Sequence, residues 1–422
     1  MWEQIRSNQV RSAVLIVVMA MLLLAIGYII GLAFFQNPIG GLVIALIVWG
    51  IMTLVAWFQG DSIFLSLSKA RKIKKDDYPK LYNVVEEMKI ASGLEKMPDI
   101  YIIDDPALNA FATGRDPNKA SVAITSGLLQ RLNRDELQGV IGHEMAHIRN
   151  RDVLLMAVCG VLLGTIVILA WYASRILIFG GMTRGRRSTS GGGGQAQVII
   201  LIVGLVLMIV APIAAQFIYF AISRKREYLA DASSALYTRY PEGLASALEK
   251  LGASTAELKS ANKATAPMYI VNPFRPKPAG AGYGNRPAGG FSQGQAMKAS
   301  DLSSTHPPIS ERIRILRAMA GGASFKEYNN AFRQVHGGGS AIAGAALAGA
   351  GTVGLRAASS EGPVVDAKSE KKQRTREVGD VMERLNNYRT VTCECGTKWK
   401  VPPTYGNDEV LCTRCGRRLK LH

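Results

Sequence analysis

Two long apolar runs near the start of the chain limit what it can fold into. Residues 13–35 and 39–58 contain no charged side chain. Each run is long enough to cross a bilayer, because a hydrocarbon core of about 30 Å needs about 20 helical residues. A cleaved signal peptide has a shorter apolar region, of about 7 to 15 residues. The runs therefore predict a retained transmembrane hairpin within residues 1–60.

Two further apolar runs, at residues 153–179 and 198–222, predict a second transmembrane hairpin over residues 153–222. The alternative for any one run is a buried core helix. Composition agrees with a membrane protein, since 48% of residues are hydrophobic, 19% are charged and the net charge is +18. A disordered tail that binds nucleic acid would need low hydrophobicity. The expected partner is therefore the lipid bilayer rather than a nucleic acid.

Lys and Arg near the span ends predict the orientation, because they are enriched in cytoplasmic loops. Arg6 and Arg11 precede the first run, and a basic cluster at residues 69–75 follows the second. The later spans are more evenly balanced, because residues 184–187 place basic side chains in the opposite loop. We expect a multi-pass protein of the cell membrane with both termini in the cytoplasm.

Residues 61–152 and 223–336 are predicted to form two parts of one α+β domain. Short apolar segments between residues 99 and 125, bounded by Pro, Asp and Gly, are typical of strands. Asn133, followed three residues later by Glu136, predicts the start of a helix through a capping box.

Two further units are expected after this domain. Residues 337–375 begin with a stretch rich in Gly, Ala and Ser and are predicted to be a flexible linker. Residues 376–422 are predicted to form a separate tail.

The helix that begins after Asn133 contains His143 and His147. These residues are one helical turn apart, so both imidazoles leave the same face and can bind one zinc ion. Glu144 lies beside them, where a carboxylate can accept a proton from water activated by zinc. A structural zinc would normally have four protein ligands, often Cys, and no Cys lies close to this motif. The pattern therefore indicates a catalytic zinc site.

Glu227, directly after the fourth apolar run, offers a third ligand. Two His and one Glu leave a fourth coordination position open, as a catalytic zinc requires. Asp231, one turn beyond, could accept a hydrogen bond from a ligand imidazole and fix its tautomer, and an exposed helix acid is the alternative. Because His147 precedes the third run and Glu227 follows the fourth, a helical hairpin would return both to the cytoplasmic membrane surface.

Four segments together resemble the HtpX-type membrane zinc metalloproteases: residues 109–114, 143–147, 227–231 and 304–313. The resemblance covers roughly residues 1–320. It implies an α-helical membrane protein with four transmembrane helices and a cytoplasmic α+β zincin-like metalloprotease domain. It also implies a heat-shock-linked endopeptidase of membrane quality control, related to the prenyl-protein endoproteases.

The resemblance implies a role for each matching residue. By this resemblance, His143, His147 and Glu227 bind zinc and Glu144 is the general base. His306 would stabilise the oxyanion, and Arg312 would support the zinc-site acid. The edge strand that aligns the substrate would contain Asn109, Ala110 and Phe111. From the residues alone, a lone His before two prolines is more often an ordinary loop residue. An edge strand can bind an extended peptide by adding it to the sheet, although a plain buried strand is the alternative.

The tail departs from that resemblance. Cys393, Cys395, Cys412 and Cys415 resemble the two knuckles of a zinc ribbon, and reduced thiols favour metal over a disulfide. The first pair is one residue short of the usual Cys-x-x-Cys spacing. We expect a small zinc ribbon with a second, structural zinc ion.

These observations predict a membrane-anchored zinc endopeptidase that cuts polypeptide substrates, in particular misfolded or damaged membrane proteins. A non-catalytic membrane scaffold that recruits a partner through its tail is one alternative, and a prenyl-protein endoprotease is another. An intramembrane protease of the site-2 type is disfavoured, because the polar residues 149–152 directly follow the His pair.

Overall fold

The computed structural model describes most of the chain. It covers residues 2–114, 116–153, 163–168, 170–171, 209–213, 224–259, 268–271, 306–342, 344–347, 351–359 and 367–421. The third and fourth apolar runs fall largely outside these ranges. The second transmembrane hairpin, and with it the total of four spans, therefore stays a prediction.

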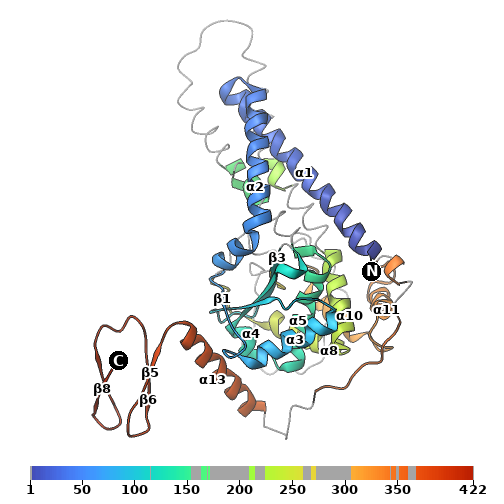
Figure 1. Cartoon of the computed structure of the whole chain (residues 1–422). Helices are drawn as coiled ribbons and strands as arrows, with labels where there is room; N and C mark the ends of the chain where they lie inside the picture. Colours follow the sequence, from blue (N-terminus) through green and yellow to red (C-terminus); the bar gives the residue numbers. More distant parts are fainter. Residues whose placement is uncertain are drawn as a thin grey trace.

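Two long helices form a hairpin that projects from the rest of the molecule (Figure 1). They are α1 (Trp2–Phe35) and α2 (Pro38–Leu67). The Asn37 side chain accepts a hydrogen bond of 2.9 Å from the Gly40 N–H and so caps the start of α2. The predicted first hairpin is therefore present as two helices.

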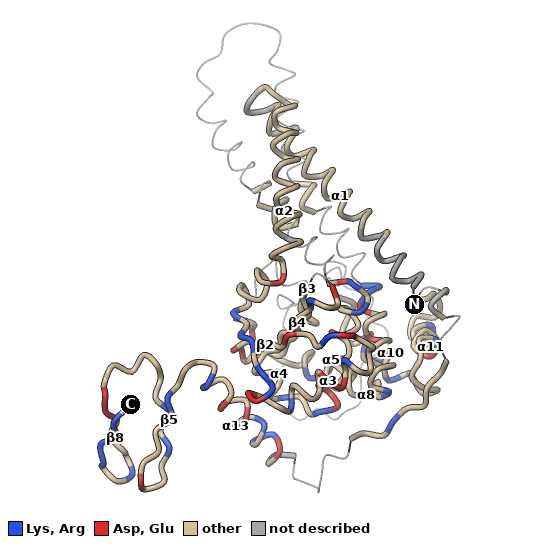
Figure 2. Tube along the Cα trace, in the orientation of Figure 1, with Lys and Arg blue, Asp and Glu red and all other residues tan. Residues whose placement is uncertain are grey.

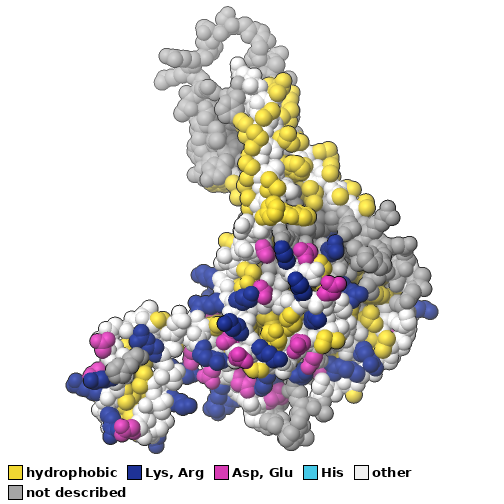
Figure 3. Space-filling view, in the orientation of Figure 1, with side chains coloured by type: hydrophobic (Ala, Val, Ile, Leu, Met, Phe, Trp, Pro, Cys, Tyr) yellow, Lys and Arg dark blue, Asp and Glu magenta, His cyan; other side chains and the backbone are white. Residues whose placement is uncertain are grey.

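The hairpin exposes apolar side chains along much of its visible face (Figure 3). Within the described part of the chain, one segment, Pro38–Val55, is long and apolar enough to cross a membrane. A shorter apolar helix, Ile16–Leu32, lies beside it in α1. The helices approach closely because Gly41 packs against Gly27, where an added Cβ would lie 2.2 Å from the Gly27 carbonyl oxygen.

A four-stranded sheet lies near the base of the hairpin, with the strand order β1-β2-β4-β3. The strands are β1 (Arg71–Lys72), β2 (Asp99–Ile103), β3 (Ala110–Gly114) and β4 (Ala120–Thr125). Strands β2 and β4 are parallel, whereas β3 is antiparallel to β4. Strand β3 is therefore at an edge of the sheet, and the short strands expected between residues 99 and 125 are confirmed.

Helices surround the sheet and share one apolar core with it. They are α3 (Pro79–Ser92), α4 (Ser126–Arg131), α5 (Arg134–Arg149), a helix over residues 224–238, α8 (Pro241–Ala253), α10 (Ile309–Arg317) and α11 (Phe325–His336). The predicted capping box at the start of α5 is present, with Asn133 and Glu136 each bonding the backbone of the other. The expected mixture of helices and strands in this domain is thus confirmed.

The short α12 (Gly344–Leu347) lies within the predicted linker, and α13 (Ala367–Leu385) runs from the end of that linker into the tail. Two hairpins follow, built from β5 (Arg389–Thr392), β6 (Lys398–Val401), β7 (Glu409–Leu411) and β8 (Arg418–Lys420). Figure 1 shows α13 against the domain and the two hairpins beyond it. The apolar side chains of Val378, Val381 and Met382 join the domain core.

Part of the predicted flexible linker is bound to the domain instead. Residues 351–359 lie on the domain, where Arg356 donates hydrogen bonds to the Asp135 carboxylate at 2.7 Å and to the Thr238 carbonyl at 2.8 Å. Val353 also pairs with Ala323 through backbone hydrogen bonds. The sequence did not predict this docking, because the segment is rich in Gly, Ala and Ser and has no apolar periodicity. Its contacts with the domain are made by one arginine and by backbone groups.

Candidate metal centre

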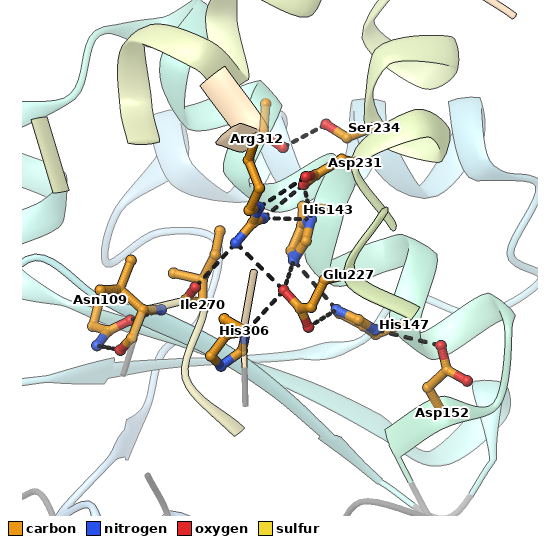
Figure 4. A network of polar contacts seen from close by, with 12 residues as sticks. Asn109, His143, His147, Asp152, Glu227, Asp231, Ser234, Ile270, His306 and Arg312 are labelled. Atoms are coloured by element: carbon orange, nitrogen blue, oxygen red, sulfur yellow. Dashed lines mark hydrogen bonds and ion pairs between the residues drawn. The ribbon is translucent and has the colours of Figure 1, made fainter. Parts of the chain in front are cut away.

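Helix α5 brings His143 and His147 together on one face, with their Nε2 atoms 3.2 Å apart. Glu227, from the helix over residues 224–238, reaches the same point (Figure 4). Its Oε2 lies 3.5 Å from the His143 Nε2, and its Oε1 lies 3.4 Å from the His147 Nε2. Two imidazole nitrogens and one carboxylate therefore converge within 4.8 Å of one another, which fits the donor set of a catalytic zinc.

A carboxylate faces the other nitrogen of each imidazole. The Asp231 Oδ1 lies 3.0 Å from the His143 Nδ1, and the Asp152 Oδ2 lies 3.4 Å from the His147 Nδ1. An acceptor at Nδ1 holds the proton there and turns Nε2 toward the metal. Asp231 was expected from its helical spacing, whereas Asp152 was missed. It appeared only as part of the polar stretch that ends α5, although its position five residues after His147 was a usable signal.

Arg312, on α10, contacts both Glu227 and Asp231, which lie on the helix over residues 224–238. Its Nη2 and Nε donate to the Asp231 carboxylate at 2.6 and 2.8 Å, and its Nη1 lies 3.4 Å from the Glu227 Oε2. The Arg312 side chain is fully buried. Burial alone would raise the pKa of Asp231, but the charge of Arg312 and the bond to His143 outweigh it and lower the pKa.

His306 precedes α10 and also reaches the centre, with its Nδ1 2.9 Å from the Glu227 Oε2. Both side chains are buried. Burial would raise the pKa of Glu227, yet the nearby His306, His143 and His147 hold it well below its usual range. The Glu227 carboxylate is therefore ionised, as a metal ligand must be.

Glu144 is buried at the junction of α5 and β3, where it accepts a hydrogen bond from the Ala112 N–H. Burial raises the pKa of Glu144, and this outweighs the lowering effect of His143 and His147. A general base works best with a pKa near the operating pH. The position and the direction of the shift both suit a group that exchanges protons.

The three residues expected to align substrate contact residues 268–271. The Asn109 side chain donates to the Val271 carbonyl at 2.8 Å, and the Ala110 carbonyl accepts from the Ile270 N–H at 3.0 Å. Phe111 is buried against Tyr269, with ring centroids 5.1 Å apart. This end of the outer β3 edge is thus occupied by the chain itself, whereas the Ala112 N–H beyond it faces Glu144.

Comparison with known proteins decides the family. The model of "Peptidase family M48" matches residues 75–320. The chain belongs to peptidase family M48. The matched region includes every residue of this metal centre, so this M48 chain is a metalloprotease. The matched region ends before the tail.

Curated relatives span the same part of this M48 chain. A protein named "Protease HtpX homolog" from Dictyoglomus thermophilum is 42% identical over 318 residues, which are 75% of this chain and 94% of the relative. Another of that name from Streptococcus pneumoniae (strain Hungary19A-6) is 41% identical over 319 residues, 76% of this chain and 100% of the relative. The solved structure of S. mikatae Ste24p is similar with a TM-score of 0.40 and 19% identity, covering 75% of this chain and 67% of that one.

Proposed function

We propose that this M48 metalloprotease is a membrane-bound zinc endopeptidase that cleaves misfolded or damaged membrane proteins at the cytoplasmic face. The observation that carries the proposal is the convergence of His143, His147 and Glu227 within 4.8 Å of one another, with Glu144 next to the first ligand in the sequence. Three protein ligands leave one coordination position open for substrate or water. A purely structural zinc would have a closed set of four.

Zinc bound to these residues supplies Lewis-acid chemistry, which polarises a carbonyl group and makes nearby water more acidic. Glu144 takes the proton from the attacking water and passes it to the leaving amine. Its raised pKa suits both steps, because the group must accept and then release a proton. The Ala112 N–H holds the Glu144 carboxylate in place, and His306 is proposed to stabilise the oxyanion.

The substrate backbone is proposed to add to the outer edge of β3 beyond Ala110, whose carbonyl is already bonded by the Ile270 N–H. An edge strand offers its free backbone groups to an extended peptide, and this recognition is independent of most side chains. Ala112 places the edge directly beside Glu144. Asn109, Ala110 and Phe111 bind the segment 268–271. They would align the peptide indirectly, by fixing the position of that segment beside the strand. Broad recognition of this kind suits a quality-control protease.

The membrane part of the proposal rests on the hairpin. Figure 2 shows almost no charge along the hairpin residues that it colours, whereas Lys, Arg, Asp and Glu are distributed over the domain and the tail. Basic residues at 69–75 lie at the base of α2, on the side of the metalloprotease domain. Positive charge at that end favours a cytoplasmic domain. The two predicted spans at residues 153–222 would then anchor the domain a second time.

The test replaces Glu144 with Gln in the full chain, reconstituted in lipid with an unfolded membrane-protein substrate. Glu144→Gln should keep its zinc and lose about 10²- to 10⁴-fold in cleavage rate, since the proton acceptor is gone. The surface variant Glu95→Gln is the matched control and should cut normally. A wild-type rate in Glu144→Gln contradicts the mechanism, and exclusive cleavage of a prenylated peptide contradicts the substrate class.

A further inference from the structure

Four cysteines of the tail gather at one point outside the region that the family match covers. Cys393 and Cys395 lie in the loop between β5 and β6, and Cys412 and Cys415 lie in the loop between β7 and β8. Their Sγ atoms all lie within 4.8 Å of one another. The shortest contacts run between the loops, at 3.5 Å for Cys393–Cys415 and 3.6 Å for Cys395–Cys412.

The two loops have the same backbone design despite their different Cys spacing. In the first, the Cys393 N–H donates to the Thr397 carbonyl and the Gly396 N–H donates to the Cys393 carbonyl, both at 2.8 Å. In the second, the Cys412 N–H bonds Arg417 and the Gly416 N–H bonds Cys412, again at 2.8 Å. Each loop turns through its glycine, with φ of +83° and +73°. The first loop is therefore a version of the second that is one residue shorter.

Backbone N–H groups point at the sulfur atoms. The Cys412 sulfur accepts from the backbone N–H groups of Arg414 and Cys415, and the Cys395 sulfur accepts from that of Thr397. Such donors stabilise thiolates, which are the form that binds metal. They also fix the direction of each sulfur, as the residues around metal ligands commonly do.

The apolar core of these hairpins is too small to hold them together. Its buried members are Cys393, Cys412 and Leu419, with Val391, Cys395 and Trp399 partly buried around them. Units of this size usually need a metal ion or disulfides to fold. A disulfide places its sulfurs about 2.05 Å apart in separate pairs. A tetrahedral zinc with Zn–S bonds of about 2.3 Å places four sulfurs about 3.8 Å apart, which is nearer to this cluster.

We propose that Cys393, Cys395, Cys412 and Cys415 bind one structural zinc ion, which is distinct from the catalytic zinc and folds the two hairpins into a ribbon. All four positions are filled by protein, so this site has no place for substrate. The ribbon is joined to α13 by Lys400, whose Nζ lies 2.8 Å from the Asp380 carboxylate and 2.6 Å from the Glu383 carboxylate. Loss of this zinc should unfold the ribbon and leave the catalytic domain intact, because, among the residues that the structure describes, the apolar core of that domain includes α13 side chains and none from the two hairpins.

The experiment counts zinc in the purified full chain by elemental mass spectrometry. Wild type should hold two zinc ions per chain, one for each candidate group. The variant Cys412→Ser/Cys415→Ser should hold one and keep its rate of peptide cleavage. The variant His143→Ala/His147→Ala should also hold one, and it should lose cleavage. Cys159→Ser, the matched control from the remaining cysteine, should hold two.

Cobalt substitution reads out the tail site even where a cysteine variant is poorly soluble. Cobalt bound to four thiolates gives strong charge-transfer absorption, which a centre with two imidazoles and a carboxylate does not produce. The proposal is overturned if wild type holds a single zinc that His143→Ala/His147→Ala removes, or if the four cysteines form disulfides. A single zinc that only the cysteine variant removes would instead refute the catalytic site and support the ribbon, so the two failures are distinguishable.

Discussion

The Asp152 Oδ2 lies 3.4 Å from the Nδ1 of His147, so the second candidate zinc ligand has its own orienting acid. Asp152→Asn should weaken zinc binding by about 10- to 100-fold, because a neutral amide, which can also turn its NH2 toward the ring, replaces the charged carboxylate that orients the imidazole. Competition with a coloured chelator at fixed pH measures this affinity. An unchanged affinity would show that Asp152 has no part in positioning His147. The exposed Glu95→Gln variant controls for the change in net charge.

Arg312 is the second test, because its guanidinium is fully buried beside Asp231. Arg312→Met should lower the free energy of unfolding by about 3–5 kcal/mol, since it leaves a buried carboxylate without its counter-charge. Arg317 on the same helix is the control. It pairs with Glu242 and Glu249 at the surface, so Arg317→Gln should cost at most about 1 kcal/mol. Denaturant unfolding of the full chain in detergent compares them, and equal losses would refute the distinction.

Asn109 supplies the third prediction. Its side chain bonds both the carbonyl and the N–H of Val271, at 2.8 and 3.3 Å. Asn109→Ala should release residues 268–271 from β3, at a cost of about 1–3 kcal/mol for the unpaired backbone groups. Hydrogen exchange at the Ile270 amide should then be faster and peptide cleavage slower. The exposed Asn118→Ala should change neither, and protected exchange in Asn109→Ala would contradict the assignment.

The docking of residues 351–359 should depend on pH through Asp135. Burial raises the pKa of Asp135, but hydrogen bonds from Ser359 and Arg356 outweigh it and lower the pKa overall. A lowered folded-state pKa means that the ionised form stabilises the fold at every pH above the unfolded value of about 3.9. This stabilisation should disappear as pH falls below that value and through the folded-state pKa.

Hydrogen exchange measures this effect at the Ser359 amide, which donates to the Asp135 carboxylate at 2.8 Å. At neutral pH, Arg356→Gln should accelerate this exchange about tenfold, as expected for the loss of roughly 1.4 kcal/mol from a charged hydrogen bond. Arg376→Gln, an exposed arginine on α13, should leave it unchanged. Wild-type protection in Arg356→Gln would refute the role of the Asp135 contact.

Several features were accessible from sequence because their cause is local. The His143 and His147 pair follows from one helical turn, and the Asn133 cap follows from a four-residue pattern. The apolar α1 and α2 follow from run length, and the paired tail cysteines follow from spacing. In each case, neighbouring residues determine the geometry, so no knowledge of the distant chain is needed.

Other features depended on which distant segments pack together. The position of Asp152, five residues after His147, made it a candidate in the sequence. Only the structure shows that its carboxylate faces the His147 Nδ1, because many polar stretches at helix ends face solvent instead. Residues 268–271 compete for the β3 edge, and Arg356 fastens the supposed linker to the domain. Spacing within the sequence indicated the His143 and His147 pair and the paired tail cysteines, and the position directly after an apolar run indicated Glu227. Tertiary packing decided how they are oriented and supported, because those hydrogen bonds join residues far apart in the chain.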